Sequence, residues 1–148
     1  MIMWPFKRKP WEKLGNAYAM QAVRDALQAR CALDIHLRDR DYRAIPSADF
    51  EQIIFDCWFP HDEPAYKSEI FDCDDFAVCF MAAVKTRWAK ISRGKEALAF
   101  GYIAADVKGM GMHAFIWHLN NKGDITFYEP QTGKPAAYVC NSIALMES

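Results

Sequence analysis

A thiol placed at the start of a helix is the first feature of this sequence with chemical potential. Cys73 stands in FDCDDF (71–76), where a polar stretch gives way to a long apolar one. Free backbone N–H groups and the positive end of the helix dipole favour a thiolate there, and the thiolate is the nucleophile of cysteine catalysis. The carboxylates of Asp72, Asp74 and Asp75 act against this, because negative neighbours raise the pKa of a thiol. A nearby imidazolium or a bound cation would have to offset them.

A base and a carboxylate that could serve such a thiol occur further along the chain. His113 opens the apolar run MHAFIW after the flexible GMG, and Glu129 stands in YEPQTG. If the strands expected at 112–119 and 124–129 pair across the turn between them, both residues fall at the same open end. A carboxylate there can hold the tautomer and orientation of the imidazole. The pattern predicts nucleophilic catalysis by Cys73, with His113 as the base.

The other cysteines and the second histidine of this region carry no such expectation. Cys79 is expected to be an inert core residue and His118 a surface or packing residue, and Cys31, Cys57 and Cys140 are expected to be inert too. The number of cysteines is odd and no pair has C-x-x-C spacing, which favours neither a disulfide framework nor a zinc site. A reduced, cytosolic setting follows.

The elements that must position these residues are predicted from hydrophobic periodicity and from breakers. An amphipathic helix is expected over 14–30, with Tyr18, Val23 and Leu27 among its inward residues, and Ser47 suits the N-cap of a second helix. The remaining expectations are helices through about 57 and over 76–89, a proline loop at 59–64, and strands at 97–105, 112–119, 124–129 and 136–140. One buried helix followed by an antiparallel meander gives an α+β layout.

Length and charge narrow the classes of protein to consider. A chain of 148 residues with 52% apolar and 25% charged residues fits one folded domain, expected at 14–148 after a basic, aromatic tail at 1–13. With 18 basic and 19 acidic residues no strong field attracts nucleic acid, and no apolar stretch approaches the roughly 18 to 20 residues that cross a bilayer. We expect neither a nucleic-acid partner nor a membrane span. The sequence has no signature of an oligomeric state.

Three separated motifs carry a family resemblance. FDCDDFA (71–77), MHAF (112–115) and YEPQTG (128–133) together resemble the papain-like domain at the C-terminus of certain fungal agglutinins, and small phage and bacterial proteins that carry this domain alone. The resemblance implies a papain-like or transglutaminase-like α+β fold, in which N-terminal helices and a buried cysteine-bearing helix pack on an antiparallel sheet. It also implies a cytoplasmic setting in a bacterial or phage-infected host. The chain has no room for the fungal sugar-binding β-trefoil, so carbohydrate binding is not expected.

The resemblance also implies roles for individual residues. Cys73 would be the nucleophile, His113 the general base and Glu129 the third member of a triad. Gln131 falls in the same motif as Glu129 and would orient a partner at the site. Tyr66 stands where the fungal proteins have an aromatic donor near the oxyanion site.

A calcium ion is the cofactor that the resemblance implies. The fungal members are calcium-dependent, and acidic side chains near the nucleophile and the triad hold the ion. Hard oxygen ligands suit such a cation, and the residues carried over are Asp74, Asp75 and Glu129. Bound calcium would also offset the negative charges beside the thiol.

The leading hypothesis is a cysteine peptidase or amidase acting on a peptide or protein substrate. Cys73 would attack the carbonyl, His113 would take and return the proton, and water would resolve the acyl-enzyme. Two alternatives stay open. The same groups serve acyl transfer to an amine, and a catalytically inactive module of this fold could bind a partner or support a phage or prophage structure.

Overall fold

The computed structural model describes residues 14–28, 35–58 and 72–147. Its helices in these ranges are α1 (Met20–Gln28), α2 (Ser47–Cys57) and α3 (Cys73–Ser92). Its strands there are β1 (Asn16–Ala19), β2 (Ile35–His36), β3 (Asp41–Ala44), β4 (Ala97–Leu98), β5 (Phe100–Val107), β6 (Gly111–Leu119), β7 (Ile125–Glu129), β8 (Lys134–Ala136) and β9 (Cys140–Glu147).

Two sheets form within the described ranges. The larger has the strand order β2-β9-β5-β6-β7-β8, and the smaller has the order β1-β3-β4. Strands β5 to β8 make an antiparallel meander, because each turn between them is short enough for a hairpin. Strand β2 runs parallel to β9, and β3 runs parallel to β4.

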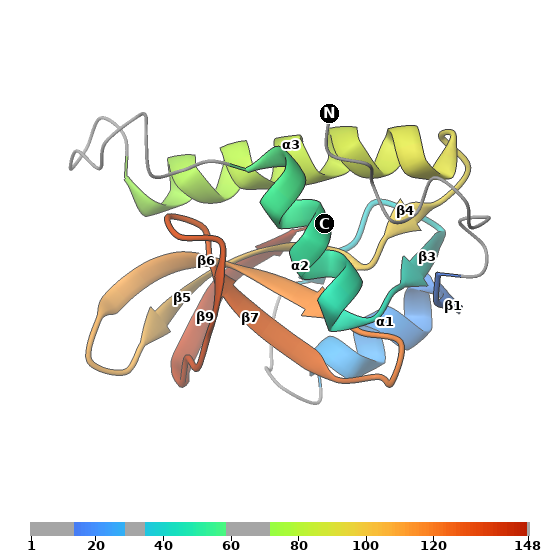
Figure 1. Cartoon of the computed structure of the whole chain (residues 1–148). Helices are drawn as coiled ribbons and strands as arrows, with labels where there is room; N and C mark the ends of the chain where they lie inside the picture. The colour runs from blue at the N-terminus through green and yellow to red at the C-terminus, as the bar shows by residue number, and fades with distance from the viewer. Residues whose placement is uncertain (1–13, 29–34, 59–71, 148) are drawn as a thin grey trace.

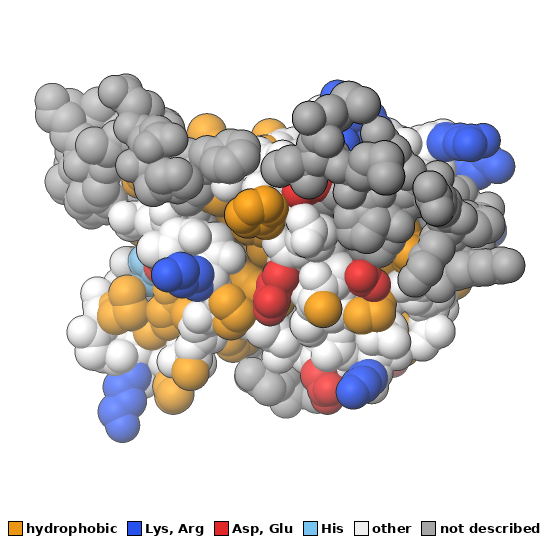
Figure 2. Space-filling view, in the orientation of Figure 1, with side chains coloured by type: hydrophobic (Ala, Val, Ile, Leu, Met, Phe, Trp, Pro, Cys, Tyr) orange, Lys and Arg blue, Asp and Glu red, His pale blue; other side chains and the backbone are white. Residues whose placement is uncertain are grey.

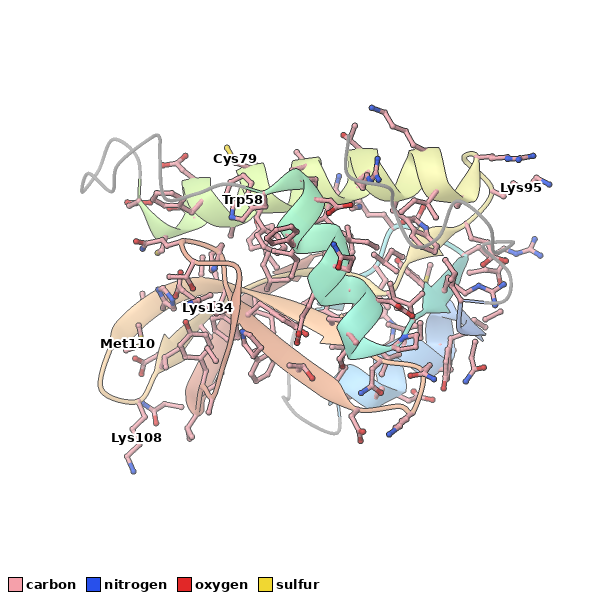
Figure 3. The ribbon with its side chains drawn as sticks, in the orientation of Figure 1. Trp58, Cys79, Lys95, Lys108, Met110 and Lys134 are labelled. Atoms are coloured by element: carbon pink, nitrogen blue, oxygen red, sulfur yellow. The ribbon has the colours of Figure 1, made fainter. Side chains whose placement is uncertain are left out.

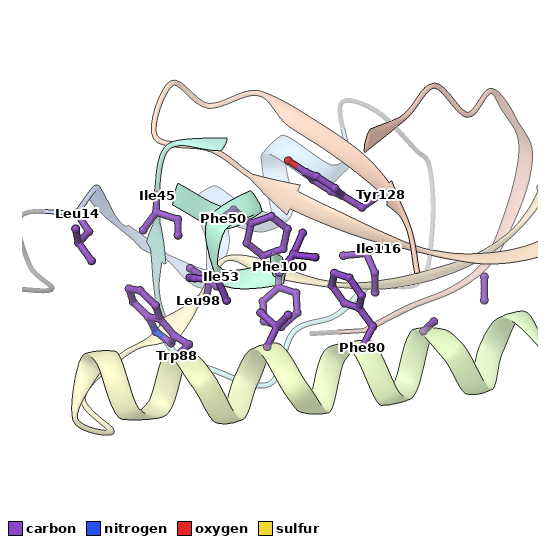
Figure 4. Packing of buried hydrophobic residues seen from close by; sticks show 14 residues of the cluster. Leu14, Ile45, Phe50, Ile53, Phe80, Trp88, Leu98, Phe100, Ile116 and Tyr128 are labelled. Atoms are coloured by element: carbon purple, nitrogen blue, oxygen red, sulfur yellow. The ribbon is translucent and has the colours of Figure 1, made fainter. Parts of the chain in front are cut away.

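The larger sheet separates two hydrophobic cores. Helices α2 and α3 lie over one of its faces, and α1 lies on the other side (Figure 1). Phe80 and Trp88 of α3 point toward the sheet and pack with Phe100 and Ile116 (Figure 4). Side chains at alternate positions of the same strands, such as Phe115, face the second core.

Helix α3 has 20 residues and runs beyond the predicted range of 76–89 at both ends, so that it begins at Cys73. Asp72 and Asp75 form a capping box, in which each side chain accepts a hydrogen bond from the other residue's backbone N–H. Arg93 ends the helix in the left-handed region at φ 54°. The Cys79 side chain points away from the sheet (Figure 3).

The predicted helix over 14–30 is wrong in its first part, which is strand β1. Strand β1 pairs with β3, and Gly15 lies so close to that strand that a Cβ atom there would be 1.9 Å from the carbonyl oxygen of Ala44. This tertiary contact overrides the local helical pattern. Val23 and Leu27 are buried in α1 as predicted.

The predicted last strand at 136–140 is also displaced. Strand β8 ends at Ala136, and β9 begins at Cys140 and returns to pair with β5 on the side opposite β6. The predicted N-cap Ser47 is instead the first residue of α2, after Pro46. The hairpin predicted between 112–119 and 124–129 is found.

The predicted papain-like or transglutaminase-like class is contradicted. The described residues form a β-rich fold with two sheets, in which N-terminal segments contribute strands as well as helices, although the broad α+β assignment fits. The reason is long-range pairing of β1, β2 and β3, which periodicity along the chain does not report. The tail at 1–13 lies outside the described residues.

None of the helices in the described ranges is long and apolar enough to cross a membrane.

Candidate functional site

Cys73 lies at the N-terminus of α3, above the end of the larger sheet where β6 begins (Figure 1). Strand β7 pairs with β6 only from Ile116 onward, so the first residues of β6 have no neighbour on that side. The backbone N–H of Ala114 uses this opening and donates a hydrogen bond to the sulfur of Cys73. The sulfur of Cys73 therefore accepts a backbone N–H of β6 at a position where no neighbouring strand pairs on that side.

The environment of Cys73 keeps its thiol protonated. Burial is the largest effect and raises the pKa of Cys73, the N–H of Ala114 opposes this, and the carboxylates of Asp72 and Asp74 raise the pKa further. The resulting direction is upward from the ordinary value. The sequence predicts that acidic neighbours disfavour a thiolate at Cys73. The folded chain shows the same effect, from Asp72 and Asp74.

His113, Glu129 and Tyr138 form a hydrogen-bonded cluster. Nε2 of His113 lies 2.7 Å from Oε2 of Glu129, and the Tyr138 hydroxyl donates to the same oxygen at 2.5 Å. Oε1 of Glu129 accepts a hydrogen bond from the backbone N–H of Gln131 at 2.9 Å. Register makes the cluster possible, because Glu129 ends β7 and His113 stands near the start of β6.

Glu129 is the acceptor of this cluster. Burial opposes its ionisation, but hydrogen bonds from His113, Tyr138 and Gln131 outweigh burial and lower the pKa of Glu129. An ionised carboxylate only accepts hydrogen bonds, so His113 must carry its proton on Nε2.

The thiol and the imidazole have different hydrogen-bond partners. Cys73 meets the backbone N–H of Ala114, whereas Nε2 of His113 meets Glu129. In the part of the chain that the structure describes, no hydrogen bond joins Cys73 to the ring of His113. The charge of a Cys73 thiolate would nevertheless raise the pKa of Tyr138, so the thiol lies near the cluster. The predicted triad is thus brought to one end of the sheet with no hydrogen bond between its first two members.

Two further residues predicted for the site have different outcomes. Gln131 contacts Glu129 through its backbone N–H, and its predicted orienting role remains a prediction. Tyr66 lies outside the described residues.

Tyr138 is a site residue that sequence reasoning missed. It follows β8 in a stretch predicted as strand, with no polar pattern to mark it. Only the return of the chain after β8 brings its hydroxyl to Glu129.

Some of the acidic residues beside the thiol are placed where they could bind a cation. Ligand atoms of Asp72, Cys73 and Asp74 lie within 4.8 Å of one another. Oδ1 of Asp72 is buried without a hydrogen-bond partner, which is an unusual state for a carboxylate oxygen. A hydrogen bond with Asp72, then burial and nearby like charges, raise the pKa of Asp74. Asp75 and Glu129 already accept other hydrogen bonds, so the donor set centres on Asp72 and Asp74.

Two solved structures are similar to this chain over most of its length. The structure of the PSL1a–E64 complex matches with a TM-score of 0.68 and 28% identity, over 84% of this chain and 49% of that one. The Polyporus squamosus lectin bound to the human-type influenza-binding epitope Neu5Acα2-6Galβ1-4GlcNAc matches with a TM-score of 0.70 and 27% identity, over 85% and 48%. This chain spans about half the length of these proteins. No curated protein matches it.

These findings contradict the predicted cysteine hydrolase and the protease class that went with it. One of the two structural neighbours is named a lectin, and the epitope that it binds is a glycan, not a peptide substrate. The alternative of a binding module agrees better with them. The physical reason lies in the site, where the thiol is held in its protonated form and has no hydrogen bond to the base.

The family model described as Agglutinin C-terminal matches residues 42–135. This segment is more than half of the chain, and it contains Cys73, His113 and Glu129 with the motifs in which they stand. The match agrees with the agglutinin part of the resemblance and leaves the papain-like protease assignment unconfirmed. The chain belongs to the agglutinin C-terminal family.

Proposed function

We propose that this chain is a binding module whose ligand lies at the Cys73 site, defined as Cys73, His113, Glu129 and Tyr138. The observation that carries the proposal is the hydrogen bonding of the described residues, in which the thiol and the imidazole have different partners and no hydrogen bond joins them. Cys73 accepts its hydrogen bond from Ala114, and His113 donates to Glu129. Proton transfer needs hydrogen-bond reach between the two groups, whereas ligand binding does not.

The protonation states of the site also favour binding. A thiol whose pKa is raised is mostly neutral at pH 7 and a weak nucleophile, but it can still contact a ligand. Glu129 is charged, yet its charge is shared among three donors before any ligand arrives. Such a preorganised cluster loses little entropy when a ligand binds.

Exposed apolar side chains near the cluster offer further contact area. Met110 and Met112, on the hairpin between β5 and β6, are 54% and 60% exposed, and Val139 is 63% exposed. Met110 and Lys108 stand at the tip of this hairpin (Figure 3). Hydrophobic side chains gather around a histidine on this side of the molecule (Figure 2). Binding sites commonly combine an apolar surface with a few fixed polar groups.

The two ligands named for the related structures are the probes for a direct test. Titration of the ¹⁵N-labelled chain with E64 should shift the amide resonances of residues 73, 114, 129 and 138 without changing the intact mass of the protein, because opening of the E64 epoxide by Cys73 would mark a reactive thiol instead. The affinity obtained from these shifts should fall by at least about tenfold in Glu129→Gln, because loss of one charged hydrogen bond is worth about 1.5 to 3 kcal/mol. Cys79→Ser is the matched control, since Cys79 is exposed on the same helix and should bind as the wild type does.

Other outcomes of this titration are equally informative. If Neu5Acα2-6Galβ1-4GlcNAc shifts the resonances of the Cys73 site, the binding function is supported and the ligand is a glycan. Shifts confined to other regions, or none with either probe, would refute the proposed site. Cleavage of a peptide library by the wild type, lost in Cys73→Ser, would refute a binding role.

The predicted calcium ion is retained as part of this proposal. The carboxylates of Asp72 and Asp74 would hold it, and its charge would satisfy the unpartnered oxygen of Asp72 and ease the crowding that raises the pKa of Asp74. Addition of Ca²⁺ should then raise the unfolding temperature, since a ligand that binds the folded state stabilises it. Mg²⁺ should do so less. The calcium-dependent increment should vanish in Asp74→Asn and persist in Asp124→Asn, an exposed carboxylate elsewhere. An equal increment in both variants would exclude this site.

A further inference from the structure

The connection between β8 and β9 lies across His113. The backbone N–H of Lys108 donates to the carbonyl oxygen of Val139 at 2.8 Å, which ties the connection to the hairpin between β5 and β6. The Tyr138 ring meets His113 edge-on, with centroids 5.4 Å apart and planes at 68°, and it packs on Phe115 at 4.5 Å. The ring is therefore held on two sides before its hydroxyl makes any contact.

The Tyr138 hydroxyl converges with the imidazole on one oxygen. It lies 2.5 Å from Oε2 of Glu129 and 3.3 Å from Nε2 of His113. Because Nε2 carries a proton and the Tyr138 hydroxyl donates to Glu129, the ring nitrogen is the donor in the 3.3 Å contact and the Tyr138 oxygen accepts. Burial, followed by the hydrogen bond to Glu129, the negative charge of Glu129 and that of a Cys73 thiolate, raises the pKa of Tyr138, so the phenol remains a donor.

We propose that Tyr138 is a positioning residue of the Cys73 site, which fixes the carboxylate of Glu129 and through it the Nε2–H tautomer of His113. That the site binds a ligand rests on the proposed function. The contacts of Tyr138 with Glu129 and His113 do not depend on a ligand. Two strands, the turn after β7 and the connection between β8 and β9 supply the groups involved, so the three donors to Glu129 come from three separate segments. Removal of one donor should free the carboxylate to rotate and weaken its hold on the imidazole.

Tyr138→Phe is the variant that tests this role. It keeps the ring packing on His113 and Phe115 and removes only the hydroxyl. The pKa of Glu129, followed by ¹³C carboxyl NMR, should rise by about one to two pH units, the size expected when a charged group loses one hydrogen bond. A tyrosine that served packing alone would leave this titration unchanged.

Tyr128→Phe is the matched control. Tyr128 is also a buried tyrosine, but its hydroxyl donates to Oε1 of Glu51 at 3.2 Å, so its loss should not move the titration of Glu129. An unchanged Glu129 titration in Tyr138→Phe, with the amide spectrum of a folded chain, overturns the positioning role. An equal shift in both variants also overturns it.

The same variant separates this inference from the proposed function. If the Glu129 titration shifts but neither probe binds the wild type, Tyr138 positions Glu129 and the binding function fails. If probes bind equally well to Tyr138→Phe and the titration does not shift, the binding function stands and the positioning role fails.

Discussion

The imidazole of His118 stacks on the ring of Phe50, with centroids 4.0 Å apart and planes only 6° from parallel. The side chain is fully buried, Tyr128 meets it edge-on, and neither ring nitrogen has a hydrogen-bond partner. His118 thus behaves as an aromatic core residue that joins β6 to α2. An unpartnered buried donor and acceptor usually destabilise a fold, which makes this residue a sensitive point of the chain.

Removal of the unpartnered nitrogens should stabilise the protein. We expect His118→Phe to raise the free energy of unfolding at pH 7 by about 1 to 2 kcal/mol, because it keeps the stacking on Phe50 and deletes two unsatisfied polar atoms. Urea denaturation measures this change. Equal or lower stability would mean that the nitrogens are satisfied in solution.

The same residue should make stability depend on pH. Burial lowers the pKa of His118 to about 3, whereas an unfolded histidine titrates near 6.5. A base whose pKa is depressed by folding contributes its full stability above the unfolded value, and the contribution falls as pH decreases from about 6.5 toward 3. The wild type should lose up to about 1.4 kcal/mol per pH unit there relative to His118→Phe. Parallel stability curves for the two proteins between pH 7 and 5 would contradict this assignment.

The turn after Glu129 should be sensitive to any side chain at Gly133. This residue has φ +69°, and its N–H donates to the carbonyl oxygen of Glu129 at 2.8 Å. An added Cβ would lie 2.8 Å from Cγ2 of Ile54, so Gly133→Ala should lower the free energy of unfolding by about 1 to 3 kcal/mol. Gly94→Ala is the control, since Gly94 has φ +68° and open space around the added atom. Equal losses in both would show that the contact with Ile54 adds nothing.

A buried ion pair should stabilise the junction of the smaller sheet with α3. Arg43 donates to both carboxylate oxygens of Glu96, at 2.8 and 3.1 Å, and also to the carbonyl oxygen of Gly15. Glu96→Gln keeps the shape but leaves a buried guanidinium without its counter-charge, so we expect a loss of about 1 to 3 kcal/mol. Asp41→Asn removes the exposed pair with Arg40 and should cost below about 1 kcal/mol. Thermal unfolding compares the two variants, and equal effects would contradict the role of burial.

We expect an alkylating agent to modify exposed cysteines before buried ones. Cys79 is exposed, whereas burial, partly offset by Arg87 and reinforced by Asp56, raises the pKa of Cys57 to about 11. Since the thiolate is the reactive form, an alkylating agent at pH 7.5 should modify Cys79 before Cys57 and Cys73. Mass spectrometry of digested, labelled protein gives the order. Faster labelling of Cys73 that is lost in His113→Ala would indicate an activated thiol and would count against the binding role.

Local patterns along the sequence are enough to predict several elements and part of the site. The capped start of α3 at Cys73 follows from a polar stretch before a long apolar one, and the hairpin of β6 and β7 follows from alternation around a glycine turn. Once that hairpin is placed, the meeting of His113 and Glu129 follows, because antiparallel register is determined by the turn. These features depend on neighbours in sequence, and so they can be read from it.

Contacts between distant segments could not be predicted in this way. The helical pattern at 14–30 gives no sign that Gly15 lies against the backbone of Ala44, and nothing near Tyr138 indicates that the chain turns back to bring its hydroxyl to Glu129. The same holds for Cys73, which accepts a hydrogen bond from the backbone N–H of Ala114, while Nε2 of His113 meets Glu129. The sequence determined which groups gather at the end of the sheet. Their contacts were decided by tertiary packing, because burial, register and the free edge of β6 set which donor meets which acceptor.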